Sequence, residues 1–356
     1  MVRLAQFPLH LKGLHMADLP AIQRFDAAGD VHLYRIPMMV FPNGFIAYSY
    51  VLLGMGVPTL IDTGSGFGRS TEDLLAGIAA LRDDFGEPLA VTDIQRILIT
   101  HGHIDHFGGV AAMIDATGGA SVGIHPLDRR VLSNYEERVV VATKNLTIYF
   151  NRAGVPAHRL PDLLSMYGFS KKHVRSVSVQ FSLEEDKPID GMHFYHVPGH
   201  CSGQVAIRIG DILLSADHIL AQTSPHLAAE SITHYTGVGH YRDSLRKIRH
   251  LEGIRLTLGG HEEPIEDVYS RIMYLEERLD FKAERVLEII RSADHPLSIY
   301  EISKALYPDK HGFDVLLALQ EAGAHVEYLY DRGHLAIANL SEFEEDDNPA
   351  LLYSAL

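Results

Sequence analysis

Residues 100–106, with the sequence Thr-His-Gly-His-Ile-Asp-His, constrain the fold of this chain more than any other stretch. They place three imidazoles and a carboxylate within six positions, directly after the apolar run at 97–99. A strand that ends in such a loop aims several side chains at one point, and imidazoles and carboxylates are ligands for zinc, iron or manganese. So many polar groups are costly to bury together unless they are paired or hold a metal. The segment therefore predicts a metal site at the end of a buried strand.

Composition narrows the class of protein. The chain has 356 residues, of which 46% are hydrophobic, enough for a large domain plus a smaller one. Its single cysteine, Cys201, excludes an internal disulfide and fits a reducing cytoplasm. Residues 1–20 contain no continuous apolar segment, so we expect neither a signal peptide nor a membrane anchor. A net charge of −15 argues against a nucleic-acid partner, because such binding depends on cationic side chains.

Short strands and helices alternate along most of the chain, which predicts layered α/β packing. We expect strands at 31–40, 45–53, 57–62, 97–100, 121–125, 193–197, 205–209, 212–215 and 255–258, and helices at 70–81, 108–116 and 241–250. A turn at 42–44 and a hairpin at 210–211 connect neighbouring strands. Residues 127–167 are rich in helix formers and are interrupted by Pro156 and Pro161, so we expect an inserted helical pair there.

The C-terminal part of the chain has a different pattern. Helices are predicted at 269–292, 299–306 and 313–322, followed by strands at 326–330 and 334–338 that pair as a hairpin, the order of a winged-helix unit. Residues 341–347 form an acidic run that we expect to be a solvated tail. We therefore divide the chain into a catalytic domain at 1–275 and a winged-helix-like domain at 276–356. From residue 293 onward there are twelve acidic and three basic residues, which favours a packing or dimerisation module over nucleic-acid binding.

Four further residues of ligand type follow predicted strands. They are Asp62, His200, Asp217 and His261. Three of them lie beside or near a glycine, which permits a tight backbone path, whereas Asp217 follows Ser215-Ala216. Taken alone each is weak, since a strand-end aspartate such as Asp62 is commonly a turn former. Their order around the His-rich segment at 100–106 points to one shared site, on loops that a rigid sheet holds in place.

With these motifs in order from Asp62 to His261, the chain resembles the metallo-β-lactamase-fold superfamily over residues 31–267. The resemblance implies an αββα sandwich, with two mixed sheets face to face and helices outside, and a dinuclear metal site at one edge. The implied ligands of the first ion are His101, His103 and His200; those of the second are Asp105, His106 and His261; Asp217 bridges the two ions; and Asp62 orders the ligand loop from outside. Asp105 and Asp62 are the candidate catalytic residues.

The implied chemistry is hydrolysis. Two divalent ions bring four positive charges and Asp105 and Asp217 return two negative ones, which favours a bridging hydroxide as the nucleophile. A side-chain nucleophile is then unnecessary, and we interpret Cys201 as a small buried residue rather than a catalytic thiol. Zinc is the expected metal, with iron or manganese as alternatives, since the same ligands accept all three.

Details of the motifs favour one branch of the superfamily. Residues 199–204 resemble the Gly-His-x-x-Gly-His/Gln segment of glyoxalase II-like and lactonase-like hydrolases, and residues 217–226 are similar to a stretch in bacterial relatives with a helical insertion and a C-terminal winged-helix-like domain. His226 and Tyr241 are candidate substrate-side residues. We find no match to the glutathione-binding residues of the C-terminal domain of glyoxalase II. The tail is neither long enough for the flavodoxin domain that flavodi-iron relatives need nor of its pattern. Only 43 residues separate Asp217 from His261, too few for the large inserted domain of RNA-processing members.

We therefore predict an enzyme that cleaves a small ester, thioester or lactone, with a small molecule as its partner and a homodimer as a possible assembly. Three alternatives stay open. They are a metal-dependent phosphodiesterase or nuclease, an iron-dependent oxidoreductase resembling persulfide dioxygenase, and a winged-helix sensor that binds a ligand without turnover.

Overall fold

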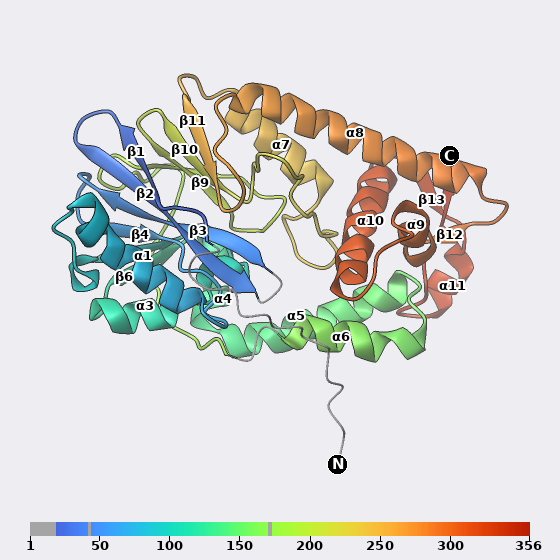
Figure 1. Ribbon diagram of the computed structural model, residues 1–356. Coiled ribbons are helices and arrows are strands. Elements are labelled where there is room, and N and C mark those ends of the chain that lie inside the picture. Colours follow the sequence, from blue (N-terminus) through green and yellow to red (C-terminus); the bar gives the residue numbers. More distant parts are fainter. Residues whose placement is uncertain (1–18, 42–43, 170–172) are drawn as a thin grey trace, which may run out of the picture.

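The structure is a computed structural model that describes residues 19–41, 44–169 and 173–356. A sandwich of two sheets occupies one side of the molecule, and a smaller helical unit occupies the other (Figure 1). Residues 42 and 43 of the predicted turn, and residues 1–18 of the N-terminal segment, lie outside the described residues.

The first sheet has seven strands in sequence order. Strands β1 to β4 pair antiparallel and strands β4 to β7 pair parallel, so the sheet is mixed. The strands are β1 (Gln23–Ala27), β2 (Val31–Phe41), β3 (Phe45–Leu53), β4 (Thr59–Ile61), β5 (Arg96–Ile99), β6 (Ser121–Ile124) and β7 (Phe181–Ser182). The sequence predicted β2 to β6 but not β1 or β7, which are a polar edge strand and a two-residue strand.

The second sheet has four strands in the spatial order β11-β10-β9-β8. It contains β8 (His193–His196), β9 (Val205–Ile209), β10 (Ile212–Ala216) and β11 (Leu256–Gly259). The predicted hairpin at 210–211 is confirmed, because β9 and β10 pair antiparallel across it with Ile209 opposite Ile212. Since β10 and β11 are parallel while β8 and β10 each run antiparallel to β9, strands β8, β10 and β11 all end at the same edge.

The predicted αββα sandwich is confirmed by three layers of apolar contact. Side chains from the facing surfaces of the two sheets, such as Leu33, Leu98 and Ile207, form the central layer. Helices α1 (Ser70–Phe85), α3 (Val110–Thr117) and α4 (Arg129–Ser133) cover the outer face of the first sheet. Helix α7 (Val238–Arg249) and the first half of α8 (Val268–Ser292) cover the second sheet.

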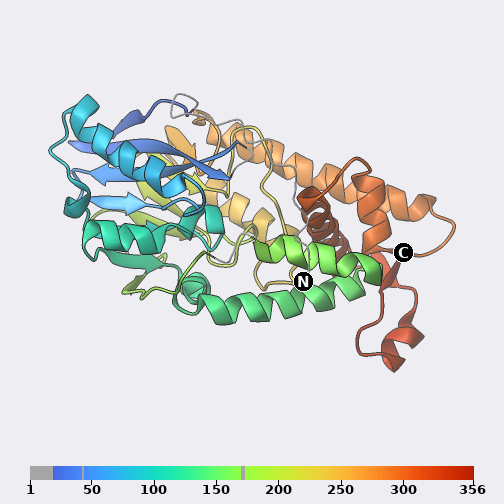
Figure 2. The same cartoon turned by 60° about the horizontal axis from the view of Figure 1, so that its bottom comes forward.

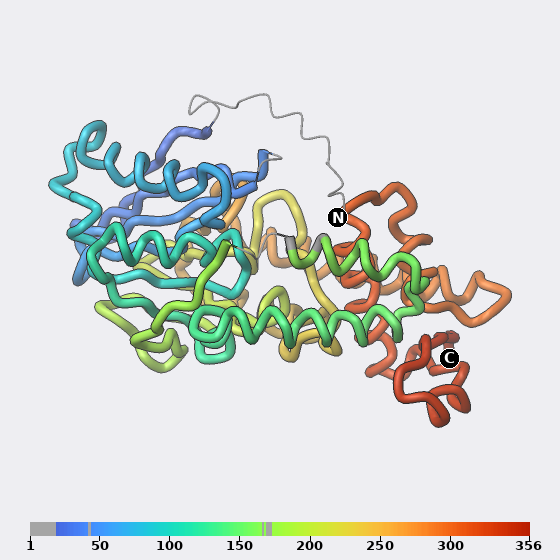
Figure 3. Tube along the Cα trace, turned by 90° about the horizontal axis from the view of Figure 1, so that it is seen from below, coloured from blue at the N-terminus to red at the C-terminus, as the bar shows by residue number. Residues whose placement is uncertain are grey.

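The helical insertion predicted at 127–167 contains α4, α5 (Tyr135–Arg152) and α6 (Leu160–Phe169). Viewed from below, α5 and α6 run from the sandwich toward the C-terminal unit (Figures 2 and 3). There they share an apolar cluster with the second half of α8, α9 (Ile299–Leu306) and α10 (Phe313–Asp331). Tyr149 on α5 donates its hydroxyl to the carbonyl of Leu319 on α10 at 2.9 Å.

The hairpin predicted at 326–330 and 334–338 is wrong. Helix α10 continues to Asp331, because the buried residues Leu319, Ala322, Val326 and Leu329 extend one apolar stripe at helical spacing into the shared cluster. Only β13 (Leu335–Ile337) is a strand, and its partner is β14 (Leu352–Ala355), which also pairs with β12 (Leu297–Ser298).

The acidic run at 341–347 is exposed, as predicted, but it is not a tail. It includes α11 (Leu340–Glu345), after which the chain returns to form β14. Helix α8 passes through residue 275 without a break, so the division of the chain there stays a prediction. Among the residues that the structure describes, no helix is long and apolar enough to cross a membrane.

Candidate metal centre

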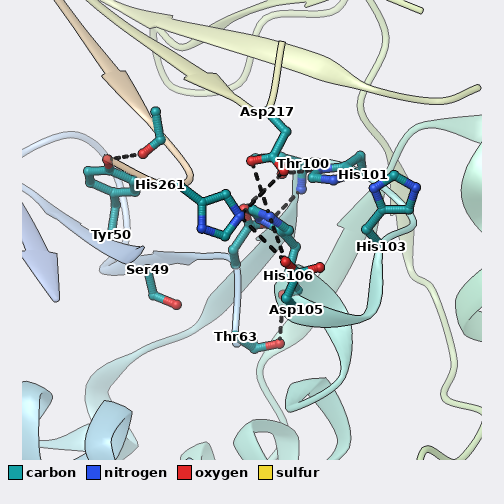
Figure 4. Close-up of polar contacts among 12 residues, drawn as sticks. Ser49, Tyr50, Thr63, Thr100, His101, His103, Asp105, His106, Asp217 and His261 are labelled. Carbon is teal, nitrogen blue, oxygen red and sulfur yellow. Dashed lines mark hydrogen bonds and ion pairs between the residues drawn. The ribbon is translucent and has the colours of Figure 1, made fainter. Parts of the chain in front are cut away.

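The ligand-type residues of the sequence converge at one edge of the sandwich. Strands β4, β5, β8, β10 and β11 end there and release, respectively, Asp62, His101, His200, Asp217 and His261. The short helix α2 (Ile104–Phe107) adds Asp105 and His106. Figure 4 shows six of these side chains gathered at this edge, namely His101, His103, Asp105, His106, Asp217 and His261. The carboxyl ends of strands are where ligands bind in open α/β sheets, because the following loops meet there.

Tight backbone paths bring the loops this close. Asp62 and Ala216 have positive φ values of 61° and 46°, conformations that side chains other than glycine adopt rarely. Gly260 leaves no room for a side chain, because a Cβ atom there would lie 2.4 Å from Asp217 Oδ1 and 2.5 Å from His106 Cε1. Backbone strain of this kind is typical of functional sites.

Three imidazoles form the first group. One ring nitrogen from each of His101, His103 and His200 lies within 4.8 Å of the others. His103 Nδ1 and His200 Nε2 are 2.8 Å apart, within hydrogen-bond distance. Such an arrangement of nitrogens on one point suits a tetrahedral ion with a position left for water or substrate.

Asp105, His106 and His261 form a second group by the same distance criterion. His261 Nε2 lies 3.4 Å from Asp105 Oδ2 and 3.4 Å from Asp217 Oδ2. Asp217 stands between the groups, since its other oxygen is 3.3 Å from His106 Nε2 and its Oδ2 is 3.6 Å from His200 Nε2. Because Asp217 Oδ2 lies between His261 of the second group and His200 of the first, this carboxylate is placed to contact an ion in either group.

The donor set fits divalent cations. His101 Nε2, His106 Nε2, His261 Nε2 and Asp217 Oδ1 are buried and have no hydrogen-bond partner within the described part of the chain. Leaving buried polar atoms unsatisfied is costly, and the exceptions in native proteins need an explanation. Ion coordination would satisfy all four atoms, since neutral imidazole and carboxylate are the ligands these metals use.

The outer nitrogens of the rings are held by fixed acceptors. His200 Nδ1 donates to the carbonyl of His226 at 2.6 Å, and His261 Nδ1 donates to the carbonyl of Ile46 at 2.7 Å. His106 Nδ1 lies 2.8 Å from Asp62 Oδ2. These contacts fix the ring orientations and turn each Nε2 toward the centre, the usual arrangement around a protein-bound metal.

Asp62 also ties the ligand loop to its strand. It is buried and accepts hydrogen bonds from both the backbone N–H and the hydroxyl of Thr100, each at 2.8 Å. Thr100 immediately precedes His101, so Asp62 orders both ends of the segment at 100–106. Asp62 has the contacts that the ordering role implied by the resemblance would need, and the role itself stays a prediction.

The ionisable side chains of the site differ in charge between its two groups. Burial lowers the pKa of His101 and His103 well below the usual range, and their imidazole neighbours add to the effect. Burial acts the same way on His261, but Asp217 and Asp105 outweigh it and raise the pKa to about 10. Burial opposes ionisation of Asp105, yet His106 and His261 lower its pKa to about 2. Neutral imidazoles therefore line one half of the site, and ion pairs line the other.

The remaining candidates from the sequence have structural contacts. Tyr241 is 1% exposed and donates its hydroxyl to the carbonyl of His218 at 2.9 Å. His226 Nε2 lies 3.0 Å from Gln320 Oε1 on α10. Nothing in these contacts bears on a substrate, so that role stays a prediction for both residues.

Cys201 is buried, and its thiol donates to Asp128 Oδ2 at 3.2 Å. Burial raises the pKa of this thiol well above its usual value, and the nearby Asp128 carboxylate adds to the rise. The thiol is thus the opposite of an activated nucleophile, in agreement with our interpretation of the sequence.

Sequence reasoning missed Asp128 itself. It lies just before α4, is 3% exposed, and contacts both of the loops that carry the first imidazole group. Burial raises its pKa, while hydrogen bonds from Cys201 and Gly102 oppose the rise. An aspartate after His-Pro-Leu reads as an ordinary turn residue, and no spacing in the sequence connects it to residues 26 and 73 positions away.

Comparison with known proteins agrees with this geometry. The family described as the metallo-beta-lactamase superfamily matches residues 42–261, a range that begins three residues before β3 and ends at the last ligand-type histidine. The chain belongs to the metallo-β-lactamase superfamily. That range is more than half of the chain and contains every member of the His/Asp cluster. Membership supports a hydrolase that binds divalent metal.

Two curated relatives cover most of the chain. One is named a probable metallo-hydrolase, YqjP, of Bacillus subtilis, 25% identical over 84% of this chain and 92% of the relative. The other is named a beta-lactamase-like protein 2 homolog of Drosophila melanogaster, 24% identical over 92% of this chain and 97% of the relative. Both alignments extend well beyond the 220 residues matched by the superfamily.

A crystal structure of a metallo-beta-lactamase family protein from Thermus thermophilus has the same fold. Its TM-score is 0.72 at 24% identity, and the alignment covers 91% of this chain and 98% of that one. A beta-lactamase domain protein from Burkholderia ambifaria gives a TM-score of 0.70 at 19% identity over 97% of both chains. The fold therefore recurs over most of the chain, in alignments longer than the sandwich alone.

Proposed function

We propose that this superfamily member is a hydrolase of small esters, thioesters or lactones that depends on two divalent metal ions. The observation that carries the proposal is the cluster of seven ligand-type side chains at one sheet edge. Within the described part of the chain, His101 Nε2, His106 Nε2, His261 Nε2 and Asp217 Oδ1 of this cluster are buried without hydrogen-bond partners. His101, His103 and His200 would hold one ion, Asp105, His106 and His261 the other, and Asp217 would contact both.

When bound, such ions lower the pKa of water and polarise a substrate carbonyl, which is the chemistry that hydrolysis needs at neutral pH. The protein supplies the rest. Asp105 is ionised at neutral pH, because His106 and His261 hold its pKa near 2 against the effect of burial. It lies at the open side of the cluster, with its side chain 14% exposed, where it can orient a water molecule and accept its proton.

An apolar surface for substrate adjoins the cluster. The ring of Phe45 lies 4.6 Å from that of His261, between centroids, and the residue is 43% exposed. A large exposed aromatic side chain beside a metal centre offers contact area to the acyl or lactone part of a substrate. This surface supports small organic substrates.

A cavity of about 250 Å³ adjoins the loop that carries His200. Its lining comes from the first turns of α5, including Arg138, and from residues 230–234. The carbonyl of His234, in its wall, accepts a hydrogen bond from Ser202 at 2.7 Å, two residues beyond His200. We propose that the part of the substrate away from the cleaved bond lies here, so that the insertion at 127–167 contributes to recognition.

The finer assignments are part of the same proposal. Zinc is the metal we expect, the cytoplasm the compartment, and a homodimer a possible assembly. A winged-helix-like name for the C-terminal unit is supported by its element order, with α9 and α10 between β12 and the β13–β14 pair. Its acidic composition supports packing rather than nucleic-acid binding.

The test combines metal analysis with a substrate panel. We expect about two equivalents of divalent metal per chain, and hydrolysis of lactones, thioesters or p-nitrophenyl esters that falls by at least about 100-fold in Asp105→Asn. Asp115→Asn, an exposed carboxylate on α3 that pairs with Arg175, is the matched control and should retain full activity.

Other outcomes would contradict the proposal. Cleavage of bis-p-nitrophenyl phosphate alone would indicate a phosphodiesterase. Stoichiometric iron with oxygen consumption would indicate an oxidoreductase. Retention of a nucleic acid or small ligand without turnover would indicate a sensor, and full esterase activity in Asp105→Asn would remove the role given to that residue.

A further inference from the structure

A single buried carboxylate joins the two loops that carry the first imidazole group. Asp128 Oδ2 accepts a hydrogen bond from the backbone N–H of Gly102 at 2.8 Å and from the thiol of Cys201 at 3.2 Å. Gly102 stands between His101 and His103, and Cys201 directly follows His200. The two residues that Asp128 contacts are therefore immediate neighbours, along the chain, of the three histidines.

The same two loops approach Asp128 too closely for side chains. A Cβ atom on Gly102 would lie 3.2 Å from Asp128 Cγ and 2.9 Å from a methyl group of Val131. A Cβ atom on Gly203 would lie 2.7 Å from Asp128 Cγ and 2.8 Å from its backbone nitrogen. Real Cβ atoms do not approach neighbours so closely, so glycine at 203 is required by the packing against Asp128.

Burial of the Asp128 carboxylate is energetically unfavourable. Asp128 is 3% exposed and forms no ion pair with any of the described residues, and burying an unpaired charge is costly. Hydrogen bonds from Gly102 and Cys201 and the field of Arg138 compensate for part of that cost. An uncharged turn residue could precede α4 equally well. The hydrogen bonds that the carboxylate accepts from Gly102 and Cys201 therefore explain why an aspartate is found at this position.

Asp62 provides the comparison. It holds Thr100 and His106 and makes no hydrogen bond to the described loop at 200–203. Asp128 contacts that loop and the middle of the segment at 100–106, from an element outside both sheets. The two carboxylates thus hold different halves of the site.

We propose that Asp128 is a positioning residue for the metal centre: it sets the spacing between the His101–His103 loop and the His200 loop, and so the affinity of that side for its ion. The inference rests on the proposed function, because it takes the three imidazoles as ligands of one ion. It also gives the helical insertion a second role, since its first turn becomes part of the support of the centre. Outer partners of metal ligands contribute about 10–100-fold to metal affinity.

The experiment is a zinc titration of metal-free protein against a chromogenic chelator, repeated with cobalt to follow its visible absorption bands. In Asp128→Asn one of the two binding steps should weaken by about 10-fold, and in Asp128→Ala by up to about 100-fold, while the other step stays within about threefold of wild type. The cobalt bands of the weakened step should change in intensity, because the ligand geometry changes. Gly203→Ala displaces Asp128 from the opposite side and should reproduce the effect with the carboxylate intact.

Asp73→Asn is the matched control. Asp73 is also a buried carboxylate, which accepts from the backbone N–H of Met39 at 3.0 Å and pairs with Arg69, and it contacts neither loop. It should lower the unfolding temperature but leave both zinc affinities unchanged. If the Asp128 variants behave in the same way, with loss of stability alone, the inference is overturned while the proposed function stands. If wild-type protein binds no zinc, both fail.

Discussion

Replacing Asp62 gives the sharpest test of how the ligand loop is held. Its carboxylate accepts three hydrogen bonds of 2.8 Å in a buried position, from Thr100 N, Thr100 Oγ1 and His106 Nδ1. Each buried donor left without an acceptor costs about 1–3 kcal/mol, and breaking a buried carboxylate interaction as a whole costs about 3–5 kcal/mol. We take about 3–5 kcal/mol for the loss of the three bonds together.

The backbone adds a separate contribution. Asp62 has a φ of 61°, and alanine in the left-handed region costs about 1–2 kcal/mol, whereas glycine adopts it freely. We therefore expect the free energy of unfolding to fall by about 4–7 kcal/mol in Asp62→Ala and by about 3–5 kcal/mol in Asp62→Gly. Asp62→Asn tolerates the conformation and keeps one acceptor, so it should lose only about 1–3 kcal/mol.

The assay is urea unfolding of the metal-free proteins in the presence of a chelator, followed by far-ultraviolet circular dichroism. Natural domains are stable by about 5–15 kcal/mol, so Asp62→Ala should unfold at much lower urea than wild type. The order of midpoints should be wild type, Asn, Gly, Ala. Equal midpoints for Gly and Ala would refute the backbone part of the reasoning, and a wild-type midpoint for Asp62→Gly would refute the hydrogen-bond part.

Three further predictions concern the centre and its supports. Gly260→Ala would place a methyl group 2.4 Å from Asp217 Oδ1. We expect it to weaken metal binding by at least about 10-fold, as measured by equilibrium dialysis. Unchanged metal content would show that the loop can move aside. Metal binding at pH 7–8 should release at least one proton, because the pKa of His261 near 10 keeps its imidazole protonated until a metal displaces the proton. Metal affinity should therefore rise with pH up to about 10. Calorimetry in buffers of different ionisation enthalpy measures the proton release, and a lack of release would contradict the prediction. Gly323→Ala on α10 should destabilise the protein by about 1–3 kcal/mol, because its Cβ would lie 2.0 Å from the Tyr149 hydroxyl. Adding Tyr149→Phe should recover part of this loss in thermal unfolding. If the losses of the two single variants simply add in the double variant, the contact does not cause the destabilisation.

The sequence was sufficient for the parts of the fold that depend on local pattern. Strands β2 to β6 and β8 to β11 are short apolar runs closed by glycine or polar turns, and the ligand-type residues follow them directly. Their order along the chain, which matches the motifs of the superfamily, led to the expectation that Asp62, His101, His200, Asp217 and His261 would meet; the directions of the strands came only from the structure.

The errors have a different physical origin. The segment from Val326 to Tyr330 is rich in β-branched and aromatic residues, which favours a strand locally. Its buried residues instead continue a helical stripe, and packing against α5 and α8 decides the outcome. Tertiary contacts of this kind are not visible in a window of five residues.

Asp128 shows the corresponding limit for the site. Its partners Gly102 and Cys201 are far away in the sequence, and one of the two contacts is to a backbone N–H, which any residue possesses. Spacing rules detect side chains that share a role, as in the His-x-His-x-Asp-His segment. They do not detect a side chain whose role is to hold the backbone between others.

The 25-residue helix α8 restricts how this molecule can move. Ile272, Leu275 and Leu279 pack on the sandwich, whereas Val286 and Ile290 pack in the cluster of the C-terminal unit. The helix contains neither glycine nor proline, the residues at which helices usually bend. A hinge between the two halves would have to bend or break this helix, so we expect the two halves to move as one body.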